Sequence, residues 1–363
     1  MRFTWLSRYL PRIGASRRNG KRDPLRGLLG VEQFQRTLRR ERARTDRSGD
    51  AFSLLTLTPR ERRTFDQTLD FLADLLKDRL RITDEAGWLS RRAVGVVLPN
   101  TPAGGAWKLA DDLCLAFPEA MAPPLCAVYS YPSDFLTDED RRAGTLWRLS
   151  EDGKPVGAME ILFVKRLPAW KRCLDILGAI AGMIVLAPLL LLIALAVKLT
   201  SAGPVFFRQR RAGLGGRQFT LYKFRSMIDR AEMMQKALLA FNEQDGPAFK
   251  MADDPRSTPL GRLLRKTSLD ELPQLWNVLK GDMSLVGPRP LPCRESEVCL
   301  AWQKWRLDVT PGLTCIWQVN GRSRVTFAEW MRMDLEYARC RSFAGDLRLL
   351  AQTIPAVFRR DGI

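Results

Sequence analysis

The stretch ILGAIAGMIVLAPLLLLIALAV, residues 176–197, contains no charged side chain. A helix of this length can cross the hydrocarbon core of a bilayer, which is about 30 Å thick. Pro188 lies near the middle, where a proline removes a backbone hydrogen bond and clashes with the preceding turn. We therefore expect a membrane helix over about residues 173–200 that is kinked or broken at this proline.

Basic residues flank the apolar run on both sides. Lys165, Arg166, Lys171 and Arg172 precede it, and Lys198, Arg208, Arg210 and Arg211 follow it. Because Lys and Arg gather on the cytoplasmic side of a membrane, a basic flank at each end indicates a hairpin that enters the membrane and returns to the same face. A single proline-kinked span is the alternative that the sequence leaves open.

The composition limits both the partners and the chemistry. The chain has 363 residues and a formal net charge of +18, so its expected partners are anionic: nucleic acid, acidic lipid headgroups or phosphorylated substrates. It has no histidine, which excludes Ser-His and Cys-His nucleophile pairs, histidine-ligated zinc and an imidazole base. The seven cysteines contain no C-x-x-C pair, which is typical of small thiols in a reducing cytoplasm.

Two segments precede the apolar run. Residues 1–29 form a basic arm without an apolar region of signal-peptide length, so no secretory cleavage is expected. In residues 30–160, the runs AFSLLTLT and AVGVVLPN predict strands of a small soluble α/β domain. The stretch RRAVGVVLPNTPAGGAWKLADDL is similar to the last strand and helix of GGDEF-type cyclases, but SRRA (residues 90–93) stands in place of their metal-binding turn. We expect a degenerate, noncatalytic domain for regulation or dimerisation.

A basic strand is predicted after the apolar run, in FTLYKFRSM (residues 219–227). Because strand side chains alternate between two faces, Lys223 and Arg225 share one face. Two neighbouring cations suit a diphosphate. An amphipathic strand with a solvated basic edge is the structural alternative.

A pair of carboxylates, Asp270 and Glu271, follows several cations in GRLLRKTSLDELPQ. The cations are Arg262, Arg265 and Lys266. Ser268-x-x-Glu271 also fits a helix capping box, and this structural interpretation stays open. Chemically, an aspartate near cations can stay ionised and attack phosphorus while its neighbour binds a metal or moves a proton. We expect Asp270 as nucleophile, Glu271 as helper and both as ligands of Mg²⁺, because this ion prefers oxygen ligands and phosphates.

Two more motifs follow the carboxylates. The prolines of GPRP (residues 287–290) restrict the backbone around Arg289 and present its guanidinium to an anion, although a rigid loop with an exposed arginine is the alternative. In VTPGLTCIWQVNGRS (residues 309–323), Gln318 and Arg322 lie near Trp317. This polar and aromatic cluster suits sugar or base contacts and equally a hydrogen-bonded core loop.

Together these motifs resemble the bacterial sugar transferase family of monotopic polyprenyl-phosphate phosphoglycosyl transferases. In order they are KR-x-x-D (Lys171, Arg172, Asp175), the Pro188-broken helix, YKFRSM, LRKTSLDELPQ, GPRP and PGLTCIWQVNGRS. The resemblance covers about residues 165–363. It implies a mainly helical catalytic domain with a re-entrant helix, which makes the whole chain mixed α/β.

The resemblance also implies a two-step, Mg²⁺-dependent reaction. Asp270 attacks the β-phosphorus of a UDP-sugar and expels UMP, and undecaprenyl phosphate then takes the sugar phosphate. Lys223 and Arg265 would contact phosphates, and Arg289 with Pro290 would help to hold the nucleotide. Larger relatives often carry four transmembrane helices ahead of the catalytic unit, whereas this chain has a soluble, arginine-rich domain there.

We therefore expect an enzyme at the cytoplasmic face of the bacterial inner membrane that initiates an extracellular polysaccharide or glycan. Its partners are a UDP-sugar, undecaprenyl phosphate and inner-leaflet lipids, with a homodimer left open. A nonenzymatic membrane-tethered scaffold or signalling protein is the alternative. Nucleic acid is not expected as a partner, because no stacking aromatics are interleaved with the arginines in a recognisable module. The motifs do not specify the sugar, since epimers differ by a few hydrogen bonds.

Overall fold

The computed structural model describes residues 27–61, 64–133, 136–137, 139–140, 145–251, 253–320 and 325–358. Its secondary structure is mixed α/β, which confirms the predicted class. The chain divides into an N-terminal unit, residues 1–163, and a C-terminal unit, residues 164–363, and each is described by itself. Most of the predicted basic arm lies outside the described residues, so the arm stays a prediction.

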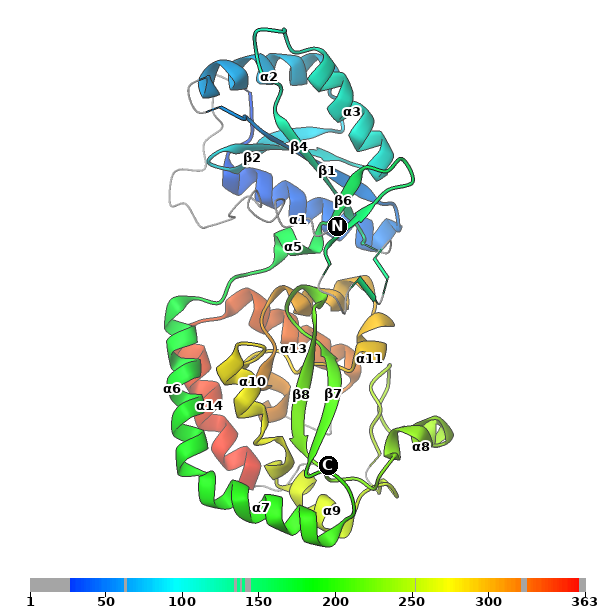
Figure 1. Cartoon of the computed structure of the whole chain (residues 1–363), viewed down its shortest axis with the longest axis vertical. Helices are drawn as coiled ribbons and strands as arrows, with labels where there is room; N and C mark the ends of the chain where they lie inside the picture. The colour runs from blue at the N-terminus through cyan, green and yellow to red at the C-terminus, as the bar shows by residue number, and fades with distance from the viewer. Residues whose placement is uncertain are drawn as a thin grey trace. The chain divides into compact units, whose positions relative to one another are not determined.

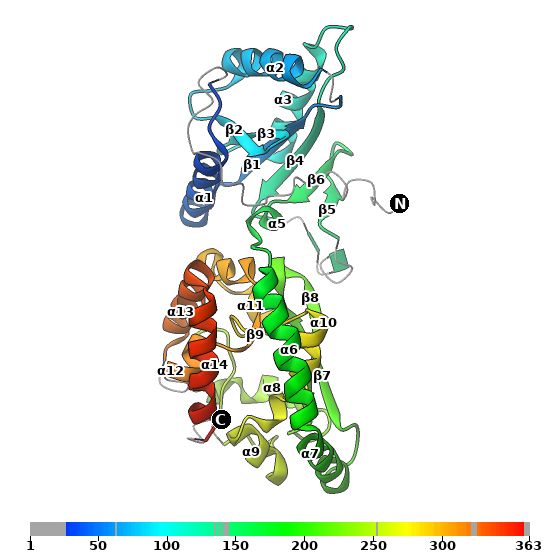
Figure 2. The same cartoon turned by 90° about the vertical axis from the view of Figure 1, so that its left-hand side faces the viewer.

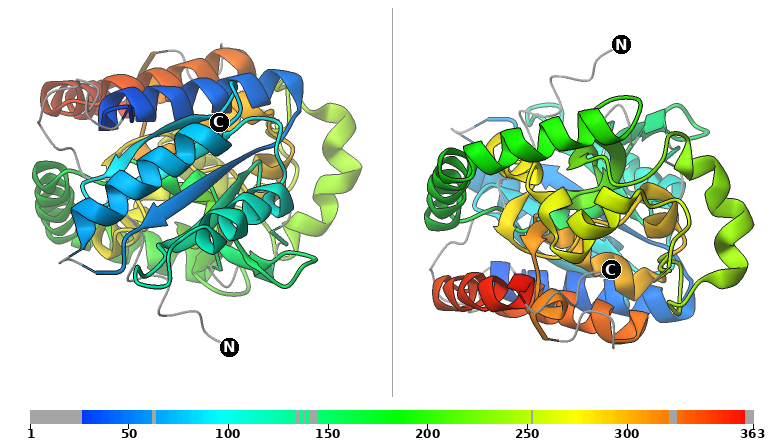
Figure 3. Two further views of the ribbon diagram at one scale, coloured as in Figure 1. Left: turned by 90° about the horizontal axis from the view of Figure 1, so that it is seen from above. Right: turned by 90° about the horizontal axis from the view of Figure 1, so that it is seen from below.

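The N-terminal unit is a sheet covered by helices (Figures 1 and 3). Its helices are α1 (Val31–Ser48), α2 (Phe65–Arg79), α3 (Ala103–Leu115) and α5 (Glu160–Phe163), and its strands are β1 (Phe52–Thr58), β2 (Glu85–Ser90), β3 (Ala93–Leu98), β4 (Leu125–Tyr131), β5 (Trp147–Leu149) and β6 (Pro155–Ala158). The strand order is β2-β3-β1-β4-β6-β5, and only β4 and β6 pair in parallel among these strands of the described chain. The predicted runs AFSLLTLT and AVGVVLPN contain β1 and β3.

Helices on both faces of the sheet explain why β1 and β3 are continuous apolar runs. Leu55 of β1 packs among side chains of α2 and α3, whereas the adjacent Leu54 packs against Phe34 of α1. Neighbouring strand residues thus belong to two cores on opposite faces. A Cβ at Gly95 of β3 would lie 2.6 Å from the Phe34 ring, so a glycine is required where α1 approaches the sheet.

The C-terminal unit combines helices with two short two-stranded sheets in its described residues. Its elements are α6 (Ala169–Val185), α7 (Ala187–Thr200), β7 (Phe206–Ala212), β8 (Gln218–Phe224), α8 (Ala231–Leu238), α9 (Pro259–Lys266), the 3₁₀ turn η4 (Leu269–Glu271), α10 (Gln274–Lys280), β9 (Ser284–Val286), α11 (Cys293–Glu297), the 3₁₀ helix η5 (Ala301–Asp308), β10 (Gly312–Thr314), α12 (Ile316–Asn320), α13 (Phe327–Cys340) and α14 (Phe343–Phe358). Strand β7 pairs with β8 antiparallel, and β9 pairs with β10 in parallel.

The apolar run folds as two helices, α6 and α7, which meet at Leu186 (Figure 2). In the described chain no single helix is long and apolar enough to cross a membrane; α6 and α7 together have suitable length and composition but are bent by 63°. Pro188 lies in the first turn of α7, two residues after the break. A proline fits there because the first amides of a helix have no partner within the helix.

The KR-x-x-D motif attaches α6 to the rest of the C-terminal unit. Arg172 donates hydrogen bonds to two carbonyls at the end of α10, at 2.7 and 2.6 Å. Asp175 accepts hydrogen bonds from the Leu285 amide and a neighbouring serine hydroxyl, both at 2.9 Å. Lys171 forms a buried ion pair with Asp346 of α14. These polar contacts attach one side of an otherwise apolar helix to α10, β9 and α14 of the C-terminal unit.

Candidate active site

The two carboxylates lie on a single 3₁₀ turn and not in an α-helix. Asp270 and Glu271 belong to η4, between α9 and α10, and both side chains are buried. Ser268 has φ +57°, a left-handed conformation, and its side chain caps no helix. Helix α10 begins only after Pro273. The capping-box interpretation is therefore wrong, because Ser268 adopts a left-handed conformation and its side chain accepts no hydrogen bond from the turn that follows.

Glu271 is held by two cations from different elements. Lys223 of β8 donates a hydrogen bond to Oε1 at 2.6 Å. Arg289 donates to Oε2 at 3.0 Å and, through its other terminal nitrogen, to Oε1. Burial alone would raise the pKa of Glu271, but the charges of Arg289 and Lys223 outweigh burial and hold this pKa well below its usual range.

Asp270 has the opposite electrostatic character. Burial raises the pKa of its carboxyl to about 6, Lys223 opposes this effect and Glu271 adds to it, while Arg265 and Arg289 lower it again. None of the described residues donates a hydrogen bond to the Asp270 carboxylate. A carboxylate with free lone pairs and a raised pKa is more basic than an ordinary aspartate, yet it is mostly ionised at neutral pH. This combination suits a nucleophile.

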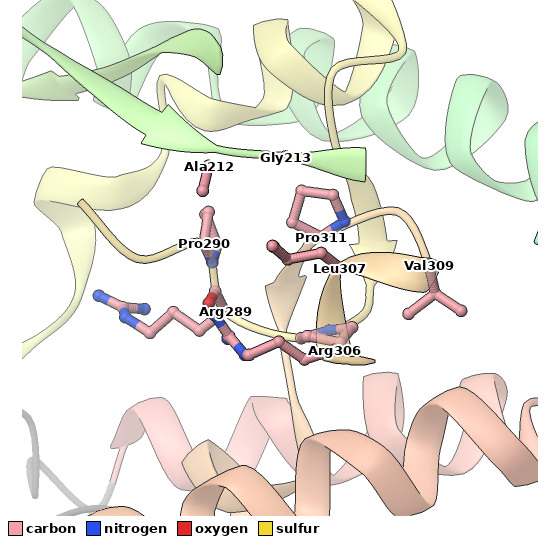
Figure 4. A pocket seen from close by; sticks show the side chains of 9 residues that line it. Ala212, Gly213, Arg289, Pro290, Arg306, Leu307, Val309 and Pro311 are labelled. Atoms are coloured by element: carbon pink, nitrogen blue, oxygen red, sulfur yellow. The ribbon is translucent and has the colours of Figure 1, made fainter. Parts of the chain in front are cut away.

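The Arg289 turn is fixed by hydrogen bonds to its carbonyls. The Gly312 amide donates to the Pro288 carbonyl at 2.9 Å, Arg211 donates to the Pro290 carbonyl at 2.9 Å, and Arg306 donates to the carbonyl of Arg289 itself. Arg289, Pro290 and Arg306 are among the residues that line a small cavity next to the end of β7 (Figure 4). The turn is therefore anchored on both sides of the arginine that binds Glu271.

Arg211 is a site residue that the sequence reasoning missed. It lies at the end of β7, and its pKa falls to about 10, mainly through burial and then through the nearby charge of Arg289. The charge of Glu271 also acts on Arg211, so Arg211 lies near this carboxylate together with Lys223 and Arg289. Alternation along FFRQRRA could have found it, since positions 207, 209 and 211 are less exposed than 206, 208 and 210.

Arg225 follows strand β8, which ends at Phe224, and its side chain contacts Ser201. It donates two hydrogen bonds to Ser201, at its carbonyl and its hydroxyl, both at 2.7 Å. The Arg225 amide still donates to the Val205 carbonyl at 2.9 Å, so the backbone pairing continues to this residue. Contact of Arg225 with a substrate stays a prediction.

The contacts of the other predicted residues differ, and Arg265 is the one whose charge acts on Asp270. Arg265 influences Asp270 electrostatically while donating to the Ser257 hydroxyl at 2.9 Å and lying 3.7 Å from Asp254. Gln318 accepts a hydrogen bond from the Cys315 thiol at 2.9 Å. Arg322 lies outside the described residues.

Asp270 and Glu271 are the residues that would hold a magnesium ion at this site. Mg²⁺ commonly uses one or two protein carboxylates and completes its shell with water and substrate phosphates. Asp270 offers oxygens without a described donor, and Oε2 of Glu271 accepts a single described hydrogen bond. Among the described residues there is no group of three His, Cys, Asp or Glu side chains that could hold a metal ion, so most ligands would come from the substrate.

Comparisons with known proteins show the family of this chain. The model of a family described as bacterial sugar transferase matches residues 166–360. The chain is 40% identical over 191 residues to "Exopolysaccharide production protein ExoY" of Sinorhizobium fredii, covering 52% of this chain and 84% of the relative. It is 42% identical over 200 residues to "Undecaprenyl-phosphate galactose phosphotransferase" of Salmonella typhimurium, covering 53% of this chain and 41% of the relative. It is 42% identical over 201 residues to "UDP-glucose:undecaprenyl-phosphate glucose-1-phosphate transferase" of Caulobacter vibrioides, covering 53% of this chain and 70% of the relative.

The chain spans less than half the length of the curated relatives from Salmonella typhimurium and Streptococcus agalactiae. Solved structures that resemble it include the FimX GGDEF domain of Pseudomonas aeruginosa. That match has 13% identity and a TM-score of 0.29, and it covers 34% of this chain and 86% of the other.

Proposed function

Because the chain belongs to the bacterial sugar transferase family, we propose that it transfers a sugar phosphate from a UDP-sugar to undecaprenyl phosphate and releases UMP. The printed names of two relatives, from Salmonella and Caulobacter, support the lipid acceptor, and the Caulobacter name supports the UDP-sugar donor. The name of the Sinorhizobium relative supports a role in polysaccharide production. The observation that carries the proposal is the buried Asp270 beside Lys223 and Arg289, to which none of the described residues donates a hydrogen bond.

The reaction proceeds in two displacements at one phosphorus. In the first, an Asp270 oxygen forms a bond to the β-phosphorus while the bond from this phosphorus to the oxygen bridging the two phosphates breaks, and UMP leaves. In the second, a phosphate oxygen of undecaprenyl phosphate attacks the same phosphorus and the bond to Asp270 breaks. The aspartate is thereby regenerated, and the product is a lipid-linked diphosphosugar.

The cations stabilise negative charge during both steps. Lys223 and Arg289 are fixed by Glu271, and Arg211 adds a third positive charge beside them. Fixed charges in a buried site need no reorganisation as charge develops on the phosphate oxygens. Glu271 thus acts first by orienting its two cations. When Mg²⁺ is bound by Asp270 and Glu271, it supplies further positive charge to the diphosphate.

Helices α6 and α7 are proposed to enter the inner leaflet and return to the cytoplasmic face. Both helices expose large apolar side chains, which supports burial in lipid; they include Leu177, Ile184, Val185, Leu191, Leu192, Leu195 and Leu199. In a cysteine-free background, the variants Arg166→Cys and Ala202→Cys test this topology. A membrane-impermeant thiol reagent should label both from the same side of the membrane, whereas a crossing helix would give labelling from opposite sides.

The N-terminal unit is proposed to be a degenerate GGDEF-like domain without catalysis of its own. Residues 90–93, SRRA, form the turn between β2 and β3 and include no carboxylate. Replacing Arg91 and Arg92 together with alanine should leave UMP release unchanged. A loss of UMP release in this variant would indicate that the turn takes part in the reaction.

The enzymatic proposal has a direct test. Purified protein in lipid is mixed with candidate UDP-sugars and Mg²⁺ without acceptor, and the intact mass is measured. A gain of one sugar phosphate is expected for the wild type and none for Asp270→Asn, whereas Asp229→Asn, at an exposed aspartate, is the matched control. UMP release should continue only when undecaprenyl phosphate is present. Unchanged cellular function in Asp270→Asn would instead favour the nonenzymatic scaffold.

A further inference from the structure

Arg306 lies deep in the C-terminal unit and contacts the backbone of the Arg289 turn. It belongs to η5, and it is 3% exposed. One terminal nitrogen of its guanidinium donates a hydrogen bond to the Arg289 carbonyl (Figure 4). Arg306 makes no described contact with Asp270 or Glu271, so it has no direct part in the proposed phosphate chemistry.

Asp334 fixes Arg306 from the other side. This aspartate belongs to α13 and is 1% exposed. Its Oδ2 accepts from Nε of Arg306 at 2.8 Å and lies 2.7 Å from a terminal nitrogen of the same guanidinium. The guanidinium also lies over the Trp330 ring, 5.9 Å from its centroid. Asp334 and Trp330 thus hold the guanidinium, and the terminal nitrogen that pairs with Asp334 also donates to the turn.

A buried ion pair is a costly way to stabilise a fold. Desolvation of the two charges often exceeds their attraction, and apolar side chains of similar volume are frequently as stable or more stable. Stability alone therefore gives no reason to keep this pair in the core. The contact from Arg306 to the Arg289 carbonyl suggests a different reason, because it ties the pair to the backbone of a site residue.

We infer that Arg306 and Asp334 are positioning residues for Arg289. Asp334 orients Arg306, Arg306 fixes the Arg289 carbonyl, and the fixed backbone aims the Arg289 guanidinium at Glu271. The inference rests on the proposed function, since it assigns the pair a role in that reaction. Displacements of about 1 Å at a reacting site can cost on the order of a hundredfold in rate.

The test replaces the pair by apolar residues. Asp334→Asn alone leaves a buried guanidinium without its anion, so this variant is expected to unfold easily and serves only as a reference. In the double variant Arg306→Met with Asp334→Leu, the thermal unfolding temperature should recover to within a few degrees of the wild type. Lys304→Met, on the same 3₁₀ helix, controls for the loss of a positive charge.

The readout is the covalent sugar-phosphate adduct formed after mixing with a UDP-sugar, followed by rapid quench and intact mass. The final amount of adduct counts folded sites, and the rate constant reports their geometry. For the double variant we expect a wild-type amount and a rate constant lower by about 10- to 100-fold. A purely structural role predicts a wild-type rate constant once folding is restored, and this result would overturn the inference.

A second measurement does not depend on the reaction. Hydrogen exchange of peptides covering residues 284–292 should be faster in the double variant than in the wild type, with unchanged exchange in β8 and α10. If the wild-type protein forms no adduct at all, the proposed function fails, and exchange still decides the inference. Unchanged exchange in the turn would then refute the positioning role.

Discussion

Lys223→Met removes one cation from the carboxylate pair and keeps a side chain of similar length. Lys223 is the charge that most strongly favours the ionised form of Asp270. Glu271 keeps both hydrogen bonds from Arg289 in the variant, so the geometry of the turn is retained. The substitution therefore tests mainly the electrostatic link between Lys223 and the nucleophile.

The size of the effect follows from the pKa of Asp270, which is about 6 in the folded protein. Loss of a nearby opposite charge raises a carboxyl pKa by roughly one to three pH units. At pH 7 about nine-tenths of Asp270 is ionised in the wild type, and roughly half or less would be ionised in the variant. The smaller ionised fraction of Asp270 alone then lowers the rate at pH 7 by about twofold or more. This loss of rate is reversed at higher pH, where the carboxyl ionises again.

The assay is kcat/KM for UMP release across pH 5 to 9, because its acid limb reports the free enzyme. In the wild type, kcat/KM should fall to half of its plateau near pH 6, and in the variant this fall should occur at higher pH. The limiting kcat/KM of the fully ionised form, obtained by fitting the acid limb, measures any lost phosphate stabilisation by the ammonium group. Lys280→Met, at a half-exposed lysine, controls for net charge. A variant limb at the wild-type pH, or below it, would contradict the electrostatic account.

Three further outcomes are expected. Asp270→Asn should abolish UMP release. It should also raise the free energy of unfolding at pH 7 by up to about 3 kcal/mol, because a buried carboxylate with a raised pKa costs stability once ionised. Urea unfolding at several pH values should show that this gain in stability vanishes near pH 4. Arg289→Lys should slow UMP release by about 100-fold or more in steady-state assays, since lysine cannot bind both oxygens of Glu271. Gly261→Ala should destabilise by about 1–3 kcal/mol or more in urea unfolding, because its Cβ would lie 1.8 Å from the Ser226 carbonyl oxygen.

Local features of the fold could be predicted where the sequence itself determines the backbone. The proline in the apolar run indicated a break, and the structure bends there by 63°, although the break lies at Leu186. The two-residue offset is physical, since proline is tolerated inside the first turn that follows a break. The apolar runs of β1 and β3 were recognisable for the same reason, but their order in the sheet depends on contacts between distant segments.

Candidate site residues could be predicted where they are neighbours in the sequence or follow a strand pattern. They could not be predicted where the fold brings together residues from distant segments. Asp270 and Glu271 were found as neighbours in the chain, and Lys223 was found from strand alternation. Arg211 was overlooked although alternation along β7 distinguishes its position. The Arg306–Asp334 pair was overlooked because no periodic pattern joins residues that lie 28 positions apart on different helices. Alternation placed Arg225 on the face of Lys223, whereas the hydrogen bonds of its side chain to Ser201 could not be predicted from that pattern.

The different states of the two adjacent carboxylates follow from which of them receives the cations. Lys223 and Arg289 donate to Glu271, and this leaves Asp270 close to positive charge without a hydrogen bond from any residue that the structure describes. If the same donors bound Asp270, its pKa would fall and its lone pairs would be occupied, so its oxygens would be poorer nucleophiles. A neighbouring glutamate that binds the cations therefore keeps them within range of a substrate phosphate while leaving the aspartate free to attack. On this argument, Glu271→Gln should impair the reaction chiefly by releasing the cations onto Asp270, and not by removing a proton acceptor.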